Sequence, residues 1–238
     1  MKSSIYIALD FHTKKEALDF LDVHQLNEAP VKVGMQLFYR EGPLLIQELK
    51  KRGHSIFLDL KLHDIPNTVY HAMKSLAHLD VDIVNIHASG GLDMMKAAKK
   101  GLEKGSATKI PLLLAVTQLT STDDLMLSNE LLIKEPMEQV VLSYAELAKR
   151  AGVNGVVCSV AESKFIKQLC GTEFVTVTPG IRLKHDHADD QKRIATPSQA
   201  RFSDHLVMGR SITQSKNPKA AYKRALKEWN HEYSETTN

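Results

Sequence analysis

The chain reads SIFLDLKLHDIPNT from Ser55 to Thr68, and this stretch predicts one strand-to-helix unit of the fold. Residues 55–58 form a short apolar run with the length and composition of a buried strand. Pro66 then opens a helical pattern, because the first turn is where a helix tolerates proline. The charged residues in between therefore lie where a buried strand ends and a helix begins.

Apolar runs of the same kind recur along the whole chain. Most are near-continuous Val, Ile and Leu segments, typical of parallel strands that are buried on both faces. We expect strands at residues 5–10, 31–35, 55–60, 82–87, 111–117, 153–158, 174–178 and 205–209. Helical patterns separate them, and this alternation predicts a (β/α)8 TIM barrel that forms a single domain over residues 1–238. A doubly wound open sheet is the alternative, but no G-x-G-x-x-G pattern follows the first strand.

Helix signals lie between the expected strands. Thr13 and Glu16 have the spacing of a capping box and predict the start of the first helix. The other helices are expected at 41–52, after Pro66, and at 92–103, 136–150, 162–169, 197–201 and from Pro218. The polar tail at 230–238 is expected to fray.

Composition and charge exclude several classes of protein. The chain has 43% hydrophobic residues and a net charge of only +3, from 31 basic and 28 acidic residues. No basic block interleaved with aromatic residues is present, so nucleic acid is not an expected partner. No apolar run approaches the ~18 residues of a membrane span, and the N-terminus has no signal-peptide pattern, so we expect a cytoplasmic protein. Cys158 and Cys170 are expected to be buried free thiols.

The charges that follow residue 58 favour acid–base chemistry. Residues two apart in an extended strand point the same way, so Asp59 and Lys61 are expected on one face. A lysine between Asp59 and Asp64 keeps its proton, since nearby opposite charges favour the charged form. Such a lysine donates a proton and does not attack a carbonyl. For an isolated D-x-K the alternative is a surface salt bridge beside a helix cap.

Charged and polar residues also lie at the carboxyl ends of the expected strands, where the active sites of such barrels lie. They are Asp10, Lys32, Asp59, Lys61, His87, Thr120, Arg182 and Arg210. Each alone has a structural explanation, such as a turn residue or an ion pair, but burying charges of both signs costs free energy and favours a ligand site. Gly180, Gly209 and Arg210 follow the last two strands, where barrels often bind phosphate, so we expect phosphate there.

Residues 181–195 form a polar connection without an apolar stripe, which is typical of an active-site lid. This connection contains His185-Asp186-His187-Ala188-Asp189-Asp190, which resembles a metal cluster only superficially. We interpret it as a solvated polar loop, and no metal site is predicted. For His87, a core histidine bonded to the backbone and a substrate contact both remain open.

Taken together, these segments resemble the orotidine 5′-phosphate decarboxylase family. The D-x-K-x-x-D core with its I-P-N-T continuation is the central match, although related phosphosugar barrels share the core. The supporting matches are Ala8-Leu9-Asp10, Val31-Lys32-Val33-Gly34, Asn85-Ile86-His87-Ala88, Val116-Thr117-Gln118-Leu119-Thr120-Ser121, Thr178-Pro179-Gly180-Ile181-Arg182, Asp190-Gln191 and Gly209-Arg210-Ser211-Ile212-Thr213. They run in family order from Asp10 to Thr213.

The resemblance implies a carboxy-lyase that converts orotidine 5′-phosphate (OMP) to UMP and CO₂ in de novo pyrimidine biosynthesis. It implies no cofactor. The catalytic residues carried over are Lys61, as the proton donor to C6, with Asp59 and Asp64. Asp59 holds Lys61 and lies near the departing carboxylate.

The resemblance also assigns the substrate contacts. Asp10 and Lys32 match the ribose contacts, and Thr120 matches the residue at the imide edge of the pyrimidine. Gln191 and Arg210 match the 5′-phosphate ligands, assisted by the Gly209 backbone, with Arg182 in the same closing loop. Ile65 belongs to the same substrate-binding set. Asp64 and Thr68 match residues that reach into the neighbouring subunit's site, which implies a homodimer with shared active sites.

The match has two local departures. Ser211 stands where proline is frequent in the family, and the segment 200–203 before the last strand is short. Two alternatives stay open: a magnesium-dependent phosphosugar lyase or decarboxylase of the related barrels, and a noncatalytic phosphate-binding barrel.

Overall fold

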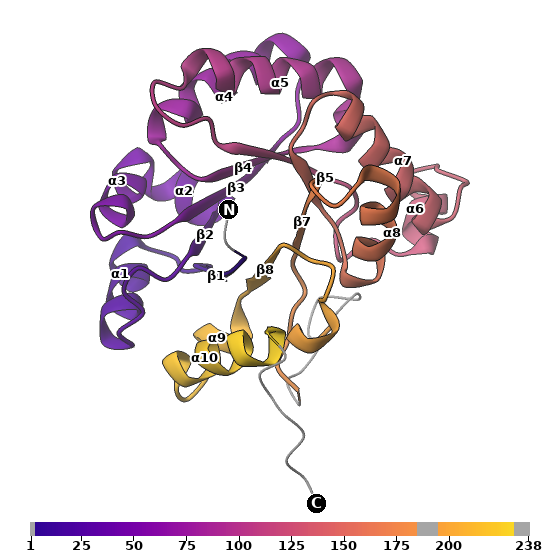
Figure 1. The fold of residues 1–238 in the computed structure, drawn as a ribbon. Coiled ribbons are helices and arrows are strands. Elements are labelled where there is room, and N and C mark those ends of the chain that lie inside the picture. Colours follow the sequence, from indigo (N-terminus) through magenta and orange to yellow (C-terminus); the bar gives the residue numbers. More distant parts are fainter. Residues whose placement is uncertain (1–2, 185–194, 231–238) are drawn as a thin grey trace, which may run out of the picture.

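A computed structural model describes residues 3–184 and 195–230 of the chain. In this part of the chain, eight parallel strands close into one barrel in sequence order (Figure 1). They are β1 (Ser4–Ala8), β2 (Val31–Gly34), β3 (Ile56–Leu62), β4 (Ile83–His87), β5 (Leu112–Val116), β6 (Gly155–Val157), β7 (Val175–Thr178) and β8 (His205–Met208). Pairing of β1 with β8 closes the ring. The predicted (β/α)8 barrel is confirmed, and the open-sheet alternative is wrong.

Helices fill the connections and surround the barrel (Figure 1). They are α1 (Lys14–Val23), α2 (Met35–Glu41), α3 (Pro43–Lys51), α4 (Pro66–Leu76), α5 (Gly91–Gly105), α6 (Asp124–Asn129), α7 (Met137–Arg150), α8 (Val160–Cys170), α9 (Arg210–Thr213) and α10 (Pro218–Trp229), with 3₁₀ turns at Ala77–Leu79, Ala88–Gly90 and Pro197–Gln199. The predicted capping box is present at α1, since Thr13 and Glu16 each accept the other's backbone N–H at 3.2 Å.

The helix predictions fail where local signals compete. The helix expected at 41–52 is α3, which begins two residues later because Gly42 adopts a φ of +64 and Pro43 opens the helix, and α2 before it was not expected. The second strand ends at Gly34, one residue early, and α2 begins at once. Helix α6 was not expected, and the helix predicted at 197–201 is a 3₁₀ turn. The expected tail at 230–238 lies outside the described residues from 231 onward.

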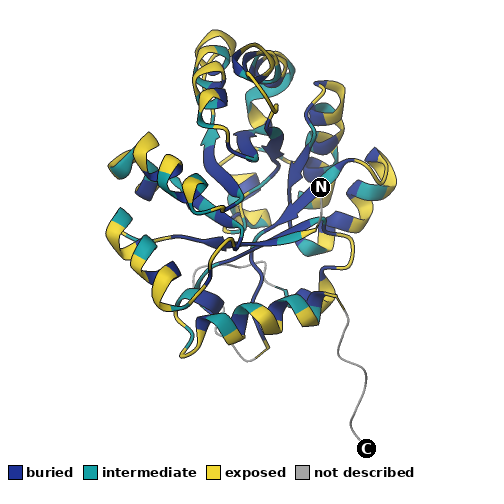
Figure 2. Cartoon of the chain, turned by 60° about the vertical axis from the view of Figure 1, so that its left-hand side comes forward, coloured by how far each residue is buried: buried dark blue, intermediate teal, exposed yellow. Residues whose placement is uncertain are grey.

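Two apolar clusters stabilise the barrel. The smaller one fills its interior with side chains from the strands only, such as Tyr6, Phe57 and Val177. The larger one joins the outward-facing strand residues to the inner faces of the helices. Figure 2 shows this division, with buried strands at the centre and helices exposed on their outer faces. Alternation along each strand therefore sends every second side chain into the barrel.

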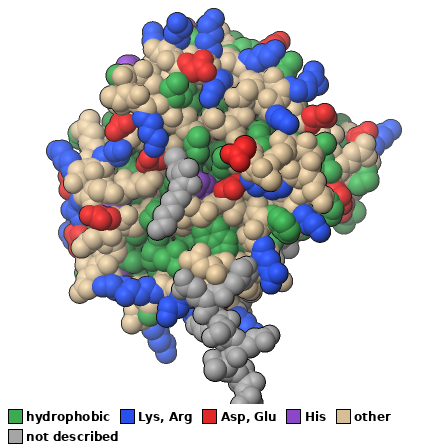
Figure 3. Space-filling model, viewed as in Figure 1, with side chains coloured by type: hydrophobic (Ala, Val, Ile, Leu, Met, Phe, Trp, Pro, Cys, Tyr) green, Lys and Arg blue, Asp and Glu red, His purple; other side chains and the backbone are tan. Residues whose placement is uncertain are grey.

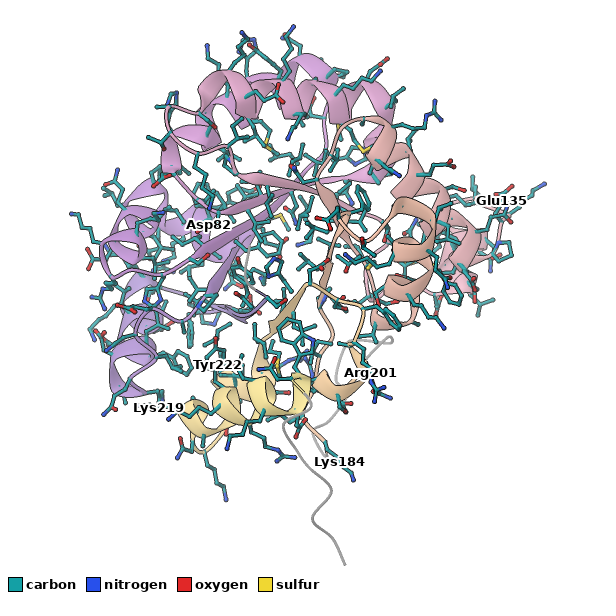
Figure 4. The ribbon with its side chains drawn as sticks, viewed as in Figure 1. Asp82, Glu135, Lys184, Arg201, Lys219 and Tyr222 are labelled. Carbon is teal, nitrogen blue, oxygen red and sulfur yellow. The ribbon has the colours of Figure 1, made fainter. Side chains whose placement is uncertain are left out.

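Polar contacts fasten the end of the barrel where the strands begin. Asp82, which precedes β4, accepts the backbone N–H of Ile56 at 2.8 Å and pairs with Lys109 at 3.0 Å (Figure 4). Tyr222 of α10 donates its hydroxyl to the Ile5 carbonyl at 3.4 Å, and burial raises the pKa of Tyr222 to about 12. The opposite end of the barrel, where the strands finish, is the end at which the active sites of such barrels lie.

The surface carries charges of both signs, and both cysteines are buried. On the face in Figure 3, Lys and Arg side chains are scattered among acidic ones and do not merge into one basic surface. No helix in the described part of the chain is long and apolar enough to cross a membrane. Cys158 and Cys170 are both buried thiols, as predicted.

Candidate active site

A cavity of ≈ 210 Å³ opens where the strands end. Eight of the predicted site residues line it: Asp10, Lys32, Asp59, Lys61, Thr120, Arg182, Gly209 and Arg210. They lie on β2 and β3 or follow β1, β5, β7 and β8 along the chain, so the closed barrel brings together residues that are far apart in sequence. This convergence at the carboxyl ends of the strands is what the barrel prediction requires.

Two lysines share one carboxylate in this cavity. Lys61 Nζ lies 2.6 Å from Asp59 Oδ1, and Lys32 Nζ lies 3.3 Å from Asp59 Oδ2. Lys32 Nζ also lies 3.4 Å from Asp10 Oδ1. Asp10, Lys32, Asp59 and Lys61 therefore form an alternating chain of charges across the strand ends, which we call the charge chain.

Burial and pairing act in opposite directions on Asp59. Its side chain is buried, with 8% of the residue exposed, and burial alone would raise the pKa of the carboxyl. The charges of Lys32 and Lys61, with hydrogen bonds from Lys61 and Asn85, outweigh burial and lower the pKa of Asp59. For Lys32, burial alone would lower the pKa, but Asp59 and Asp10 together raise it. The buried pair is therefore held ionised.

The backbone at Lys61 departs from a regular strand. Lys61 has a φ of +51, and the pairing of β3 with β4 shifts register between Leu58 and Leu62. Asn85 of β4 lies beside this irregularity and contacts both Asp59 and the Lys61 backbone, each at 2.7 Å. The prediction that Asp59 and Lys61 lie together is confirmed, although a bulge positions Lys61 and simple alternation does not.

Part of the cavity wall is apolar. Phe57, Val116, Val157 and Val207 belong to the interior cluster and also line the cavity. An apolar wall beside fixed charges suits a flat ring that carries one anionic substituent, because the ring packs while the charges orient the substituent.

Two glycines and two arginines from the segments after β7 and β8 also line the cavity. Gly180 has a φ of +77, which favours glycine, and Gly209 precedes the short helix α9. A Cβ at Gly209 would meet Ala8 and Asp10 only at 3.6 and 3.7 Å, so the protein has room for one. Because Gly209 has no Cβ, its backbone is open to the cavity beside Arg210. The Arg210 guanidinium can bind two phosphate oxygens.

Some predicted site residues lie elsewhere. Asp64, Ile65 and Thr68 are exposed at the start of α4 and do not line the cavity. Within the described residues Lys61 forms its ion pair with Asp59 and none with Asp64, whose Oδ1 accepts the Ile65 N–H at 2.6 Å. The expectation of Lys61 held between both carboxylates is therefore wrong for a single chain.

Two further predictions concern the loop that contains Gln191 and the place of His87. Gln191, most of the expected lid at 181–195 and the whole His185–Asp190 run lie outside the described residues. His87 does not line the cavity; its ring lies 5.6 Å from the ring of His63. Burial lowers the pKa of His87, as do the electrostatic interactions of its ring with His63 and Lys61.

Sequence reasoning gave no role to three residues at or beside the cavity. Gln118 and Pro179 line it, and Asn85 supports it from behind. Each lies inside a segment already matched to the family. The alternation of side chains along β4 could have indicated Asn85, because it places this polar side chain inside the barrel.

Comparisons with known proteins show which family this sequence and fold belong to. The sequence profile of the orotidine 5′-phosphate decarboxylase / HUMPS family matches residues 3–225. Proteins named orotidine 5′-phosphate decarboxylase from Bacillus cytotoxicus and Bacillus mycoides are each 54% identical over 233 residues, covering 96% of this chain and 98% of theirs. The crystal structure of orotidine 5′-phosphate decarboxylase from Lactobacillus acidophilus is 43% identical, with a TM-score of 0.85, over 96% of this chain and 100% of that one. An uncharacterized conserved protein from Geobacillus kaustophilus is 47% identical, with a TM-score of 0.84, over 95% and 100%. The chain belongs to the orotidine 5′-phosphate decarboxylase / HUMPS family.

Proposed function

We propose that this protein decarboxylates OMP to UMP and CO₂, the carboxy-lyase step of pyrimidine biosynthesis, with Lys61 as the proton donor. The observation that carries the proposal is the charge chain, in which an ionised Asp59 fixes Lys61 at 2.6 Å beside an apolar cavity wall. Family membership with full-length relatives named for this activity supports it.

The chemistry follows from the fixed charge. As the bond between C6 and the carboxylate breaks, its electron pair stays on C6 and CO₂ leaves. The Lys61 ammonium stabilises this negative charge and transfers a proton to C6, giving UMP and a neutral amine that regains its proton from solvent. An ammonium that is already in place requires no reorganisation during the reaction, and neither a cofactor nor a metal takes part in this scheme.

Asp59 has two parts in the proposal. It orients Lys61, and its buried negative charge lies near the substrate carboxylate before CO₂ leaves. Because Lys32 and Lys61 both lie against Asp59, the carboxyl stays ionised when the substrate arrives. The resulting repulsion disfavours the bound carboxylate and not the neutral CO₂ that forms.

The remainder of the nucleotide occupies the cavity on either side of this pair. Asp10 and Lys32 bind the ribose hydroxyls, and Thr120 contacts the imide edge of the pyrimidine. Arg210 and the Gly209 backbone bind the 5′-phosphate together with Arg182 and Gln191. Binding energy from the phosphate and ribose can then be used to hold the ring against Lys61.

A second copy of the chain completes the site in this proposal. Asp64, Ile65 and Thr68 lie on an exposed segment directly after the catalytic strand, and Ile65 is 67% exposed. The family resemblance supports a second subunit, because Asp64 and Thr68 match residues that reach into the neighbouring subunit's site. We therefore propose a homodimer with shared active sites, and a single-domain protein that works in the cytoplasm.

A direct assay tests the activity and separates it from the related phosphosugar enzymes. Conversion of OMP to UMP by the purified protein, followed by ultraviolet absorbance, is expected at full rate with and without EDTA. A rate abolished by the chelator and restored by Mg²⁺ would favour a magnesium-dependent lyase. Binding of UMP without any turnover of OMP would favour a noncatalytic barrel.

A further inference from the structure

Asn85 lies inside the barrel, one layer behind the charge chain. It is 1% exposed, and its register partner on β5 is Leu114, which belongs to the interior apolar cluster. Its side-chain Nδ2 donates to Asp59 Oδ1 at 2.7 Å, and its Oδ1 accepts the backbone N–H of Lys61 at 2.7 Å. It does not line the cavity.

The two contacts leave one orientation for the amide. Rotated by half a turn, the NH₂ group would face the Lys61 N–H, and the carbonyl oxygen would face the Asp59 carboxylate. Donor would then oppose donor, and acceptor would oppose acceptor, in a buried site where each unmet group costs free energy. The geometry therefore uses both halves of the amide.

The contact to Lys61 compensates for an irregular backbone. A non-glycine residue at φ +51 is uncommon and persists only where its surroundings hold it. The register shift between Leu58 and Leu62 takes Lys61 out of the regular pairing with β4. Asn85 supplies a side-chain acceptor for the N–H that this shift releases, so it stabilises the backbone turn that aims the lysine.

In the contact to Asp59, the two carboxylate oxygens have different partners. Oδ1 receives Lys61 Nζ and Asn85 Nδ2, while Oδ2 faces Lys32. With Asn85 in place, rotation of the carboxylate about its own bond would break a buried hydrogen bond to an ion. Asn85 therefore fixes which oxygen holds Lys61.

We propose that Asn85 is a positioning residue, which uses one amide to hold both the Asp59 carboxylate and the bulged backbone of Lys61 in the arrangement that delivers the proton. The inference rests on the proposed decarboxylation. It predicts that Asn85 acts on turnover and not on substrate binding, because it touches the two catalytic groups and not the cavity.

Asn85→Ala tests this split. We expect kcat to fall roughly 10- to 100-fold, the effect of losing a buried hydrogen bond to a charged group, with KM nearly unchanged. Thr176→Val is the matched control, since it removes a buried hydroxyl that bonds Phe202 O and Asp204 at the start of β7 and β8. It should lower the melting temperature without changing kcat. An unchanged kcat in folded Asn85→Ala, or an equal loss in Thr176→Val, overturns the proposal.

Asn85→Asp supplies a readout that loss of stability alone would not move. When protonated, the new carboxyl can still donate to Asp59 and accept from Lys61; when ionised, it repels Asp59. The charged and titratable groups near this position are Lys32, Asp59, Lys61 and His87 of β2, β3 and β4, whereas β5 presents apolar Leu114. All are also present in the wild type.

The ratio of variant to wild-type kcat should therefore fall as pH rises for Asn85→Asp and stay level for Asn85→Ala. A level ratio for Asn85→Asp overturns the proposal, and this variant serves alone if Asn85→Ala does not fold. If the wild-type protein does not turn over OMP, the proposed function is refuted, and the positioning role of Asn85 is a separate question. The geometry is then still tested by a crystal structure of Asn85→Ala, where an unchanged φ at Lys61 and an unmoved Asp59 would overturn the positioning role.

Discussion

At the scale of single residues, the site depends on how Asp59 is compensated. One buried carboxylate has two ammonium partners and one amide donor, so its charge remains balanced if one partner is lost. A single buried ion without a partner would instead be strongly destabilising. The same arrangement leaves Lys61, which ends the charge chain and lines the cavity, available to the substrate. Catalysis and stability can therefore be separated by substitution.

The first prediction concerns Lys61→Ala. We expect kcat to fall by about 10²- to 10⁴-fold, the usual contribution of a positioned proton donor. The fold should survive, because Lys32 and Asn85 still compensate Asp59. Steady-state kinetics and thermal melting check both statements. Substantial residual decarboxylation by a folded variant would contradict the role of Lys61.

The second prediction concerns the phosphate end. Arg210→Ala should weaken binding of UMP roughly 10- to 100-fold, because a charge-assisted hydrogen bond is lost. Arg201→Ala is the matched control: it removes the same charge from an exposed residue ahead of β8 that does not line the cavity (Figure 4). Titration calorimetry with UMP measures both, and equal affinities would count against the phosphate assignment.

At the scale of elements, the strands were predictable and the details of their ends were not. Continuous apolar runs predicted all eight strands because burial on both faces leaves a strong pattern. Helix α2 was missed because it begins directly after Gly34 with no capping residue that bonds its first turn. The bulge at Lys61 left no local signal, since its acceptor, Asn85, lies 24 residues away on the next strand. Such pairings exist only after the barrel closes.

The third prediction concerns the start of β4. Burial would raise the pKa of Asp82, but hydrogen bonds from Ile56 N–H, Lys109 and Ser55 outweigh it and lower the pKa below its ordinary 3.8. A folded-state pKa below the unfolded one adds stability above pH 3.8, and this stability is lost as the pH falls through the folded value. Asp82→Asn should therefore lose about 1–2 kcal/mol near neutral pH and progressively less in acid.

Urea unfolding at a series of pH values measures this difference. Asp80→Asn is the control, because Asp80 pairs with Lys50 at the surface and such pairs contribute little. Neither substitution should change kcat, since Asp82 lies at the end of the barrel opposite the cavity. A loss for Asp82→Asn that stays constant down to low pH would refute the role of its ionisation.

At the scale of the whole molecule, the proposed sharing of sites between two subunits has a direct consequence. If Lys61 acts with Asp64 from the other chain, Lys61→Ala and Asp64→Asn are each inactive as homodimers. A mixed dimer nevertheless contains one site in which Lys61 and the opposing Asp64 are both intact. Co-expressed in equal amounts with random pairing, half of the dimers are mixed, so we expect about a quarter of wild-type activity.

Lys61→Ala mixed with Asp59→Asn is the matched control. Lys61 and Asp59 lie 2.6 Å apart within one chain, so every site in that mixture lacks one of them and activity should not return. If the first mixture stays as inactive as its components, each site is complete within a single chain and the shared-site dimer is refuted. If Asp64→Asn alone is fully active, Asp64 has no catalytic part. Recovery only in the first mixture would place Asp64 across the subunit boundary, which explains why a residue so close to Lys61 in sequence makes no ion pair with it among the described residues of one chain.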